Sequence, residues 1–214
     1  MRQRTVAALI GATYGTLSAL WVITRRVAVR AFATQPLLTT VDTPDTRPTD
    51  LRAVARTTGV LWVFLANSAA IGLVAARGFS PTLAARLPRL RMPLPRAASR
   101  AGALLFVIDA TWCTLALIFN PGYRPFFLPP KRGARLATQG PYALVRHPRY
   151  AGEAAFNVIL PVFTGSWLPL LGVLGWPALH AQARREEEWL LRAAPEAYRD
   201  YSARAGRFPR GWPG

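Results

Sequence analysis

A chain of 214 residues is long enough for one domain with a substantial core and too short for two ordinary domains. Its hydrophobic residues, 51% of the total, gather in long windows almost without charge, which is typical of a bilayer protein rather than a soluble enzyme. The net charge of +17 would suit a nucleic-acid binder, but the arginines cluster at the ends of the apolar runs, where lipid head groups explain them. We therefore expect membrane lipids and no nucleic acid as partners. One cysteine and two histidines exclude an intrachain disulfide and argue against a metal site.

Three apolar runs predict the first three membrane helices. Thr5–Ile23 carries no charge and follows two arginines, as the apolar core of a signal peptide does. It is longer than the roughly 7–15 residues of such a core, so we expect an uncleaved span. Thr57–Ala76 and Ala101–Phe119 are the second and third runs, each long enough to cross a hydrocarbon core of roughly 30 Å as a helix.

Asp109 is the only charged residue within the third run. A charge at the centre of a membrane costs at least about 2.5–3.5 kcal/mol on insertion scales, so we expect its carboxyl to face protein or a water-filled cavity. Three roles stay open: an ion pair with a neighbouring arginine, a buried carboxyl satisfied by an amide such as Asn67 of the second run, or a residue of a ligand pocket.

The next apolar segment, Tyr150–Leu179, would reach about 45 Å as one straight helix, well beyond the hydrocarbon core. Helix breakers lie in its middle, at Gly165–Pro169. They favour a hairpin of two short membrane helices, five membrane segments in all, over one kinked and tilted span. After it, Ala178–Arg192 has the pattern of a charged amphipathic helix and Glu196–Arg204 that of a second short one. The predicted fold is an all-α integral membrane protein.

The three connections between these segments are Pro36–Asp50, Gly78–Arg100 and Asn120–Gln139. With five segments, the first connection, the third and the C-terminal tail lie on one side of the membrane and carry most of the 27 basic residues. The positive-inside rule places that side in the cytoplasm. We therefore expect a cytoplasmic C-terminal helix, at the inner or plasma membrane if the protein is bacterial.

The polar residues that suggest chemistry precede the predicted hairpin, in the segment Arg146–Tyr150. Pro148 suits the first turn of a helix, and the residue before a proline is extended, so His147 should lie at the helix mouth. Free N–H groups at that mouth favour an anion, and the guanidinium of Arg146 would add two parallel hydrogen bonds to it.

The following helix brings four side chains to one face, because they recur at helical spacing: His180, Arg184, Glu187 and Leu191. A hairpin would return this face to the neighbourhood of His147. Each residue also has a simpler interpretation, since arginines at helix ends anchor helices at the interface and glutamates pair with arginines on a solvated face. On the residues alone, the sequence predicts a membrane protein with an anion site near its C-terminus.

The segment between Arg135 and Pro209 resembles the isoprenylcysteine carboxyl methyltransferase and phospholipid N-methyltransferase family. The matching pieces, in order, are RLATQGPYALVRHPRYAGE at Arg135–Glu153, EEWLL at Glu187–Leu191, Tyr198, Tyr201 and RFP at Arg207–Pro209. The family pattern G-P-Y, R-H-P-x-Y-x-G, membrane hairpin, E-E-x-x-L and Y-x-x-Y is present with ordinary spacing. The tail departs from the family pattern, because it closes on a shortened Arg-Phe-Pro ending that contains Arg207.

The resemblance implies a methyltransferase that uses S-adenosylmethionine to methylate a lipophilic or small acceptor reached from the membrane. It divides the single membrane domain, 1–214, into three N-terminal spans (1–119) and a cofactor-binding catalytic half (120–214). It implies Arg146 and Arg207 as residues that hold the acceptor or the methionine carboxylate. The residues it implies at the cofactor are His147, Tyr150, Gly152, Glu187, Tyr142 and Tyr198.

Two other functions remain open. Tyr150–Glu153 is similar to a Tyr-x-Gly-Glu element of membrane steroid and sterol reductases, which use NADPH. A non-catalytic protein that binds anionic lipid through the same basic surface is the third. The glutamate and tyrosine motifs of the tail favour the methyltransferase. The sequence identifies neither the acceptor nor the oligomeric state.

Overall fold

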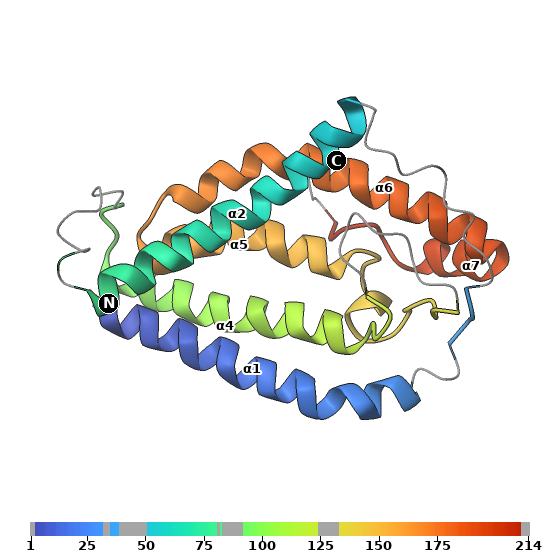
Figure 1. The fold of residues 1–214 in the computed structure, drawn as a ribbon, viewed down its shortest axis with the longest axis horizontal. Coiled ribbons are helices and arrows are strands. Elements are labelled where there is room, and N and C mark those ends of the chain that lie inside the picture. Colours follow the sequence, from blue (N-terminus) through green and yellow to red (C-terminus); the bar gives the residue numbers. More distant parts are fainter. Residues whose placement is uncertain are drawn as a thin grey trace.

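The computed structural model describes residues 3–31, 35–38, 51–80, 82, 92–123 and 133–210, and it is all-helical (Figure 1). Helices account for 79% of the described residues, which contain no strand. The helices are α1 (Gln3–Ala31), α2 (Leu51–Phe79), α4 (Arg96–Ile118), α5 (Pro148–Thr164), α6 (Trp176–Ala193) and α7 (Pro195–Arg204), with the 3-10 helices η2 (Gly140–Ala143) and η3 (Leu168–Gly175).

Three helices are long and apolar enough to cross a membrane: Arg4–Thr24 within α1, Leu51–Phe79 and Arg96–Ile118. They contain the first two predicted runs whole and the third except for Phe119, which confirms those runs as long apolar helices. Most of the predicted connection Pro36–Asp50 lies outside the described residues, as do positions 81 and 83–91 of Gly78–Arg100 and the centre of Asn120–Gln139.

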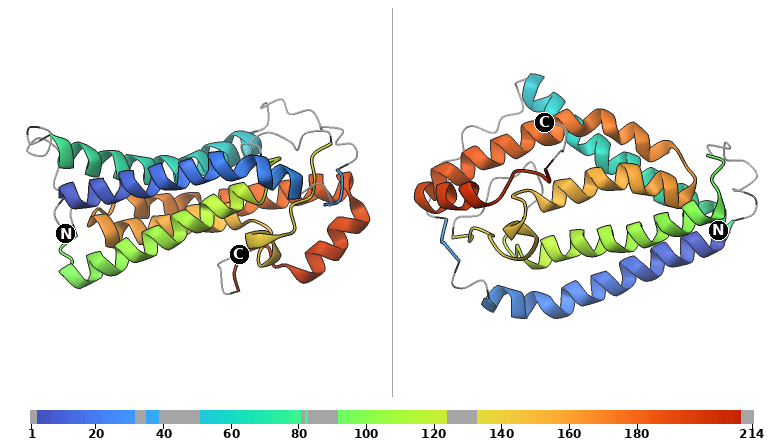
Figure 2. Two further views of the ribbon diagram at one scale, coloured as in Figure 1. Left: turned by 90° about the horizontal axis from the view of Figure 1, so that it is seen from below. Right: turned by 180° about the vertical axis from the view of Figure 1, so that it is seen from behind.

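The long helices lie side by side, as both views in Figure 2 show. Helix α4 packs along α5, α1 contacts α2 and α4, and α2 contacts η3 and α6. The core between α4 and α5 is aromatic: the Phe106 ring lies 5.8 Å from that of Phe156 and 5.0 Å from that of Phe163. The end of α4, the start of α5 and the end of α6 come together at one end of the molecule (Figure 1).

The segment from 148 to 193 reverses direction instead of continuing as one kinked helix. Helix α5 ends at Gly165, whose φ of 68° is left-handed and therefore suits a residue without a side chain. The chain then returns beside α5 through η3 and α6, and the Trp176 indole N–H donates a 3.0 Å hydrogen bond to Asn157 of α5. The return begins as the 3-10 helix η3, which hydropathy did not predict.

Glycines allow the helices to approach closely. A Cβ on Gly102 of α4 would lie 2.6 Å from the backbone nitrogen of Phe163 on α5, and one on Gly175 would lie 2.3 Å from the carbonyl oxygen of Gly59 on α2. Small residues at helix crossings are what packing between helices in lipid favours, because no hydrophobic force holds the helices together there.

Replacing Gly102 with alanine tests this packing. The new Cβ collides with backbone atoms that cannot rotate away, so Gly102→Ala should lower the free energy of unfolding by about 1–3 kcal/mol, the usual cost of overpacking. Gly72→Ala on α2 is the control, because nothing lies within 4 Å of its Cβ and alanine favours a helix by about 0.5–1 kcal/mol. Thermal unfolding in detergent measures both. Equal melting temperatures for the two variants would contradict the packing.

Candidate functional site

The start of α5 is joined to the end of the chain through the backbone. The Arg146 N–H donates to the Gly206 carbonyl at 2.7 Å and the His147 N–H donates to the Arg207 carbonyl at 3.2 Å. His147 precedes the first turn of α5 with φ −122° and ψ 61°, outside the helix, as predicted from the proline that follows it. This pairing brings the side chain of Arg207 to the mouth of α5.

The Glu187 carboxylate is the common partner of three basic side chains. Arg207 donates from Nε to Oε1 at 2.9 Å and from Nη2 to Oε2 at 2.7 Å. Arg146 contacts Oε1 from Nε and Nη2, both at 3.1 Å, and the Nε2 atom of His147 lies 3.2 Å from the same oxygen. The four residues come from two segments far apart in the sequence and from α6, and all four were predicted at the site.

These contacts keep Glu187 ionised. Burial alone would raise the pKa of its carboxyl, but the hydrogen bonds from His147, Arg207 and Arg146 outweigh burial and hold the pKa well below its ordinary value. The side chain is only 12% exposed, so solvent screens these contacts weakly.

Glu186, the preceding residue, takes the other side of His147. Its carboxylate accepts hydrogen bonds from the Tyr150 hydroxyl and from the Gln182 amide at 3.0 Å, and its Oε2 atom lies 3.6 Å from His147 Nδ1. Burial raises the pKa of Glu186, with the interactions of His147 and Tyr150 opposing that rise. The imidazole of His147 therefore lies between two carboxyls, with its ring stacked on Tyr150 at 5.6 Å.

Arg146 also fixes the following helix, α7. Its Nη1 atom donates to the carbonyls of Ser202 at 3.1 Å and Ala205 at 2.7 Å, at the end of α7. Because Nε, Nη1 and Nη2 all have protein partners, a ligand anion would have to compete with them. Arg207 is better placed to meet an anion, because its side chain is 33% exposed.

The predicted face of α6 is divided by the structure. Arg184, Glu187 and Leu191 line one groove with Arg207. His180 does not join them: it is buried, and its ring meets that of Phe208 edge-on at 4.6 Å. The Phe208 ring therefore packs against His180 of α6.

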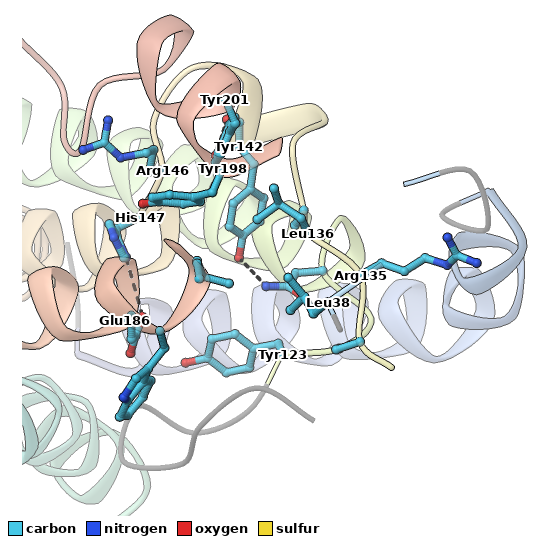
Figure 3. Close-up of a pocket in the computed structure, with 16 residues that line it drawn as sticks. Leu38, Tyr123, Arg135, Leu136, Tyr142, Arg146, His147, Glu186, Tyr198 and Tyr201 are labelled. Atoms are coloured by element: carbon cyan, nitrogen blue, oxygen red, sulfur yellow. Dashed lines mark hydrogen bonds and ion pairs between the residues drawn. The ribbon is translucent and has the colours of Figure 1, made fainter. Parts of the chain in front are cut away.

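Two hollows meet at Arg146 and Tyr198. One is a groove of about 580 Å³ between α6 and α7, in which Glu187 and Arg207 lie. The other is a cavity of about 110 Å³, shown in Figure 3, which Tyr142, His147 and Glu186 line. Ligand pockets usually measure roughly 300–1,000 Å³, so the groove is of ligand size and the cavity alone is not.

The cavity wall is mainly aromatic and aliphatic, with one acid. Most of its members were not predicted as site residues. Leu38, Tyr123 and Glu186 lie outside the matching motif pieces, whereas Leu136, Trp189 and Tyr201 lie within them. In Figure 3 the Arg135 side chain points away from it. The aromatic members of this wall suit a flat heterocycle, and its one acid, Glu186, lies among basic residues that include Arg146 and His147.

Tyr198 lies at the boundary of the two hollows with an unsatisfied hydroxyl. The residue is 4% exposed, and no described residue makes a well-formed hydrogen bond to its hydroxyl oxygen. The neighbouring Arg146 offers only donors, so the hydroxyl proton needs an acceptor from elsewhere. Buried polar groups in folded proteins nearly always have a partner, so this hydroxyl is a candidate ligand contact.

Two predicted cofactor residues do not line either hollow. Tyr150 lies behind His147 and holds Glu186. Gly152 lies in the crossing of α4 and α5, where a Cβ would be 2.3 Å from the Cys113 sulfur. Glycine is therefore needed there for packing, which the motif alone did not reveal. In the part of the chain that the structure describes, no three His, Cys, Asp or Glu side chains are grouped to hold a metal ion.

No protein-family model matches this chain, and no curated protein sequence matches it. The features of this chain that indicate a function are the motif residues between Arg135 and Pro209 and the contacts that they make in the site.

The depressed pKa of Glu187 predicts an acid-labile contribution to stability. A carboxyl whose folded pKa lies below its ordinary value of 4.5 stabilises the fold fully above that pH and loses its contribution as the pH falls towards the folded pKa. Glu187→Gln should thus lower the melting temperature at about pH 7, with a gap to the parent that shrinks below about pH 4.5. Glu188→Gln, at the exposed neighbour, should give no such gap. A gap that stays constant with pH would refute the assignment.

Proposed function

We propose that this protein is an integral membrane methyltransferase that uses S-adenosylmethionine, as the resemblance of Arg135–Pro209 implies. The observation that carries the proposal is the position of His147 between Glu186 and Glu187 beside an aromatic cavity. The two most specific pieces of the family pattern, R-H-P-x-Y and E-E-x-x-L, are distant in the sequence and meet there.

The residues present fit this cofactor, which carries a sulfonium cation between a nucleoside and an amino acid. The aromatic rings of Tyr142, Tyr198 and Trp189 would surround the cation and the nucleoside in the cavity. Arg207, in the groove, would meet the carboxylate. A ligand of this size must occupy both hollows, and the unsatisfied Tyr198 hydroxyl at their boundary supports that arrangement.

S-adenosylmethionine supplies a methyl carbon that is already electrophilic. The chain's own residues therefore have mainly to position the acceptor against this carbon and to exclude water. The ionised Glu187 fixes Arg146, His147 and Arg207 before any ligand arrives, which reduces the ordering that binding requires. Phe208, packed on His147 and His180, shields this side of the site from water.

We further propose five membrane segments, with α5 as one arm of the short hairpin and the return through η3 and the first residues of α6, to Leu179, as the other. Helix α5 has 17 residues, roughly 26 Å, which spans most of a hydrocarbon core. This arrangement places α7, the Glu187 cluster and the connection that contains Gln139 on one side of the membrane. The positive-inside rule makes that side cytoplasmic.

Cysteine accessibility in sealed vesicles tests the membrane arrangement. In a Cys113→Ala background, Gln139→Cys and Ala203→Cys should react with a membrane-impermeant thiol reagent from the same, cytoplasmic side, since both positions are exposed at the site end. Phe79→Cys, 76% exposed at the end of α2, should react from the opposite side. Labelling of Gln139→Cys and Ala203→Cys from opposite sides would mean that the proposed site does not assemble.

Direct binding of S-adenosylmethionine tests the site. His147→Ala and Glu186→Gln should each weaken binding by about tenfold or more, roughly 1.4 kcal/mol, because each removes a polar group from the cavity wall. Glu196→Gln, exposed at the start of α7 and lining neither hollow, is the control and should bind as the parent does. Circular dichroism establishes that the variants are folded. Parent-like affinity in both folded variants would show that the site is misplaced.

A further inference from the structure

Helix α2 is joined to the neighbouring helices by polar contacts at two levels. In the middle of α2, the Asn67 amide donates to the Glu153 carbonyl of α5 at 3.0 Å, and its own oxygen accepts from Asn157 at 2.8 Å. Asn67 is therefore engaged with α5, and the expectation that it satisfies Asp109 is wrong. The second level lies at the start of α2, beside the candidate site.

At this second level, a buried glutamine connects α2 to the acid of the cavity wall. Arg56 of α2 donates from Nε to Oε1 of Gln182 on α6 at 3.1 Å. The amide nitrogen of the same Gln182 donates to Oε1 of Glu186, one turn further along α6, at 3.0 Å. Gln182 is only 3% exposed and lines neither hollow. The family motifs include neither Arg56 nor Gln182.

Arg56 fixes which end of the Gln182 amide faces Glu186. A guanidinium is only a donor, so it selects the amide oxygen and turns the amide nitrogen towards Glu186. The opposite orientation would set the guanidinium against the amide N–H groups and the amide oxygen against the carboxylate. Buried polar groups need their partners, so the observed orientation is the favourable one.

Gln182 in turn decides which oxygen of Glu186 faces His147. Oε1 of Glu186 accepts from the Tyr150 hydroxyl and from the Gln182 amide, whereas Oε2 lies 3.6 Å from Nδ1 of His147. The carboxylate cannot rotate without losing both hydrogen bonds to Oε1. Burial raises the pKa of Glu186 and the Gln182 hydrogen bond opposes that rise, so loss of Gln182 would favour the uncharged carboxyl.

From these contacts we propose that Gln182 is a positioning residue of the site: it holds the Glu186 carboxylate against His147, and Arg56 holds Gln182. Gln182 touches neither a ligand nor a reacting atom, so it acts only through Glu186 and His147. Helix α2 thereby takes part in shaping the cavity from outside the motifs. The effect on cofactor binding rests on the proposed function, whereas the effect on His147 does not.

Nuclear magnetic resonance of the imidazole tests the positioning without a ligand. The chain contains only two histidines, so isotopic labelling of the ring nitrogens gives two sets of signals, and the set that is lost in His147→Ala is assigned to His147. Glu186→Gln supplies the reference shift, because it removes the charge that faces Nδ1. Gln182→Met keeps the length of the side chain and removes both hydrogen bonds. It should move the Nδ1 signal of His147 in the same direction as Glu186→Gln does, and Arg56→Met should do so by a smaller amount.

Cofactor binding in a double-mutant cycle separates positioning from packing. Gln182→Met should weaken S-adenosylmethionine binding by about threefold or more. Combined with Glu186→Gln, it should weaken binding no further than Glu186→Gln alone, because Gln182 acts through that carboxylate. A role in packing alone would add to the effect of Glu186→Gln instead.

Gln139→Met is the matched control. Gln139 is exposed before η2, and its side chain makes no capping hydrogen bond, so the His147 signal and the affinity should both stay as in the parent. An unchanged Nδ1 signal in folded Gln182→Met would overturn the proposal, as would binding effects that add in the double variant. If Gln182→Met does not fold, Arg56→Met, at a half-buried position, decides by the same signal. Absence of S-adenosylmethionine binding to the parent would refute the proposed function, whereas the His147 signal alone decides the positioning role.

Discussion

The hydrogen bonds and ion pairs of the Glu187 carboxylate hold together the end of the molecule at which the candidate site lies. Arg146 and His147 approach the carboxylate from the start of α5 and Arg207 from the end of the chain. Without an anion at this point, three basic side chains would lie together in a partly buried place and repel one another. An ion network of this kind contributes little net stability against an apolar core, but removal of its central member is costly because charges are left unpaired. Its role here is to fix the positions of the Arg146, His147 and Arg207 side chains relative to one another.

The position of Glu187 is in turn set by the packing of the helices. The left-handed turn at Gly165 reverses the chain after α5, and the glycine crossings at Gly102 and Gly175 bring α4 and α2 close enough to hold the hairpin. Another crossing, of α4 and α5 at Gly152, brings Asp109 against α5, where both Asp109 and Glu153 are buried. Close backbone approach thus has two consequences: an aromatic cavity at one end of α5 and a buried pair of carboxyls one turn along it.

The parts of the fold that are local in sequence were predictable, and the parts that depend on distant pairing were not. Hydropathy is a local property, so three long apolar helices followed from three apolar runs. Helix breakers at Gly165–Pro169 are local too, and the reversal occurs there. The 3-10 form of η3 depends on its packing against α2 and α5, which no local pattern records.

The site shows the same division. The family resemblance implied that Arg146, His147, Glu187 and Arg207 belong to one site, and in the structure their side chains lie together. Glu186 was missed because three successive glutamates are equivalent in sequence until the orientation of α6 is known. Gly152 was assigned to the cofactor because it belongs to the motif, but a motif does not show why a residue is needed. In the structure glycine is needed at this position because a side chain would collide with the sulfur of Cys113.

The most direct test of the central claim is equilibrium binding of labelled S-adenosylmethionine and of NADPH to the purified parent protein in detergent. A site built from an aromatic cavity and the Glu187 cluster should bind S-adenosylmethionine saturably, at about one molecule per chain, and unlabelled NADPH should not displace it. Saturable binding of NADPH with no binding of S-adenosylmethionine would assign the same residues to a reductase and contradict the account. Binding of neither would remove the catalytic interpretation altogether.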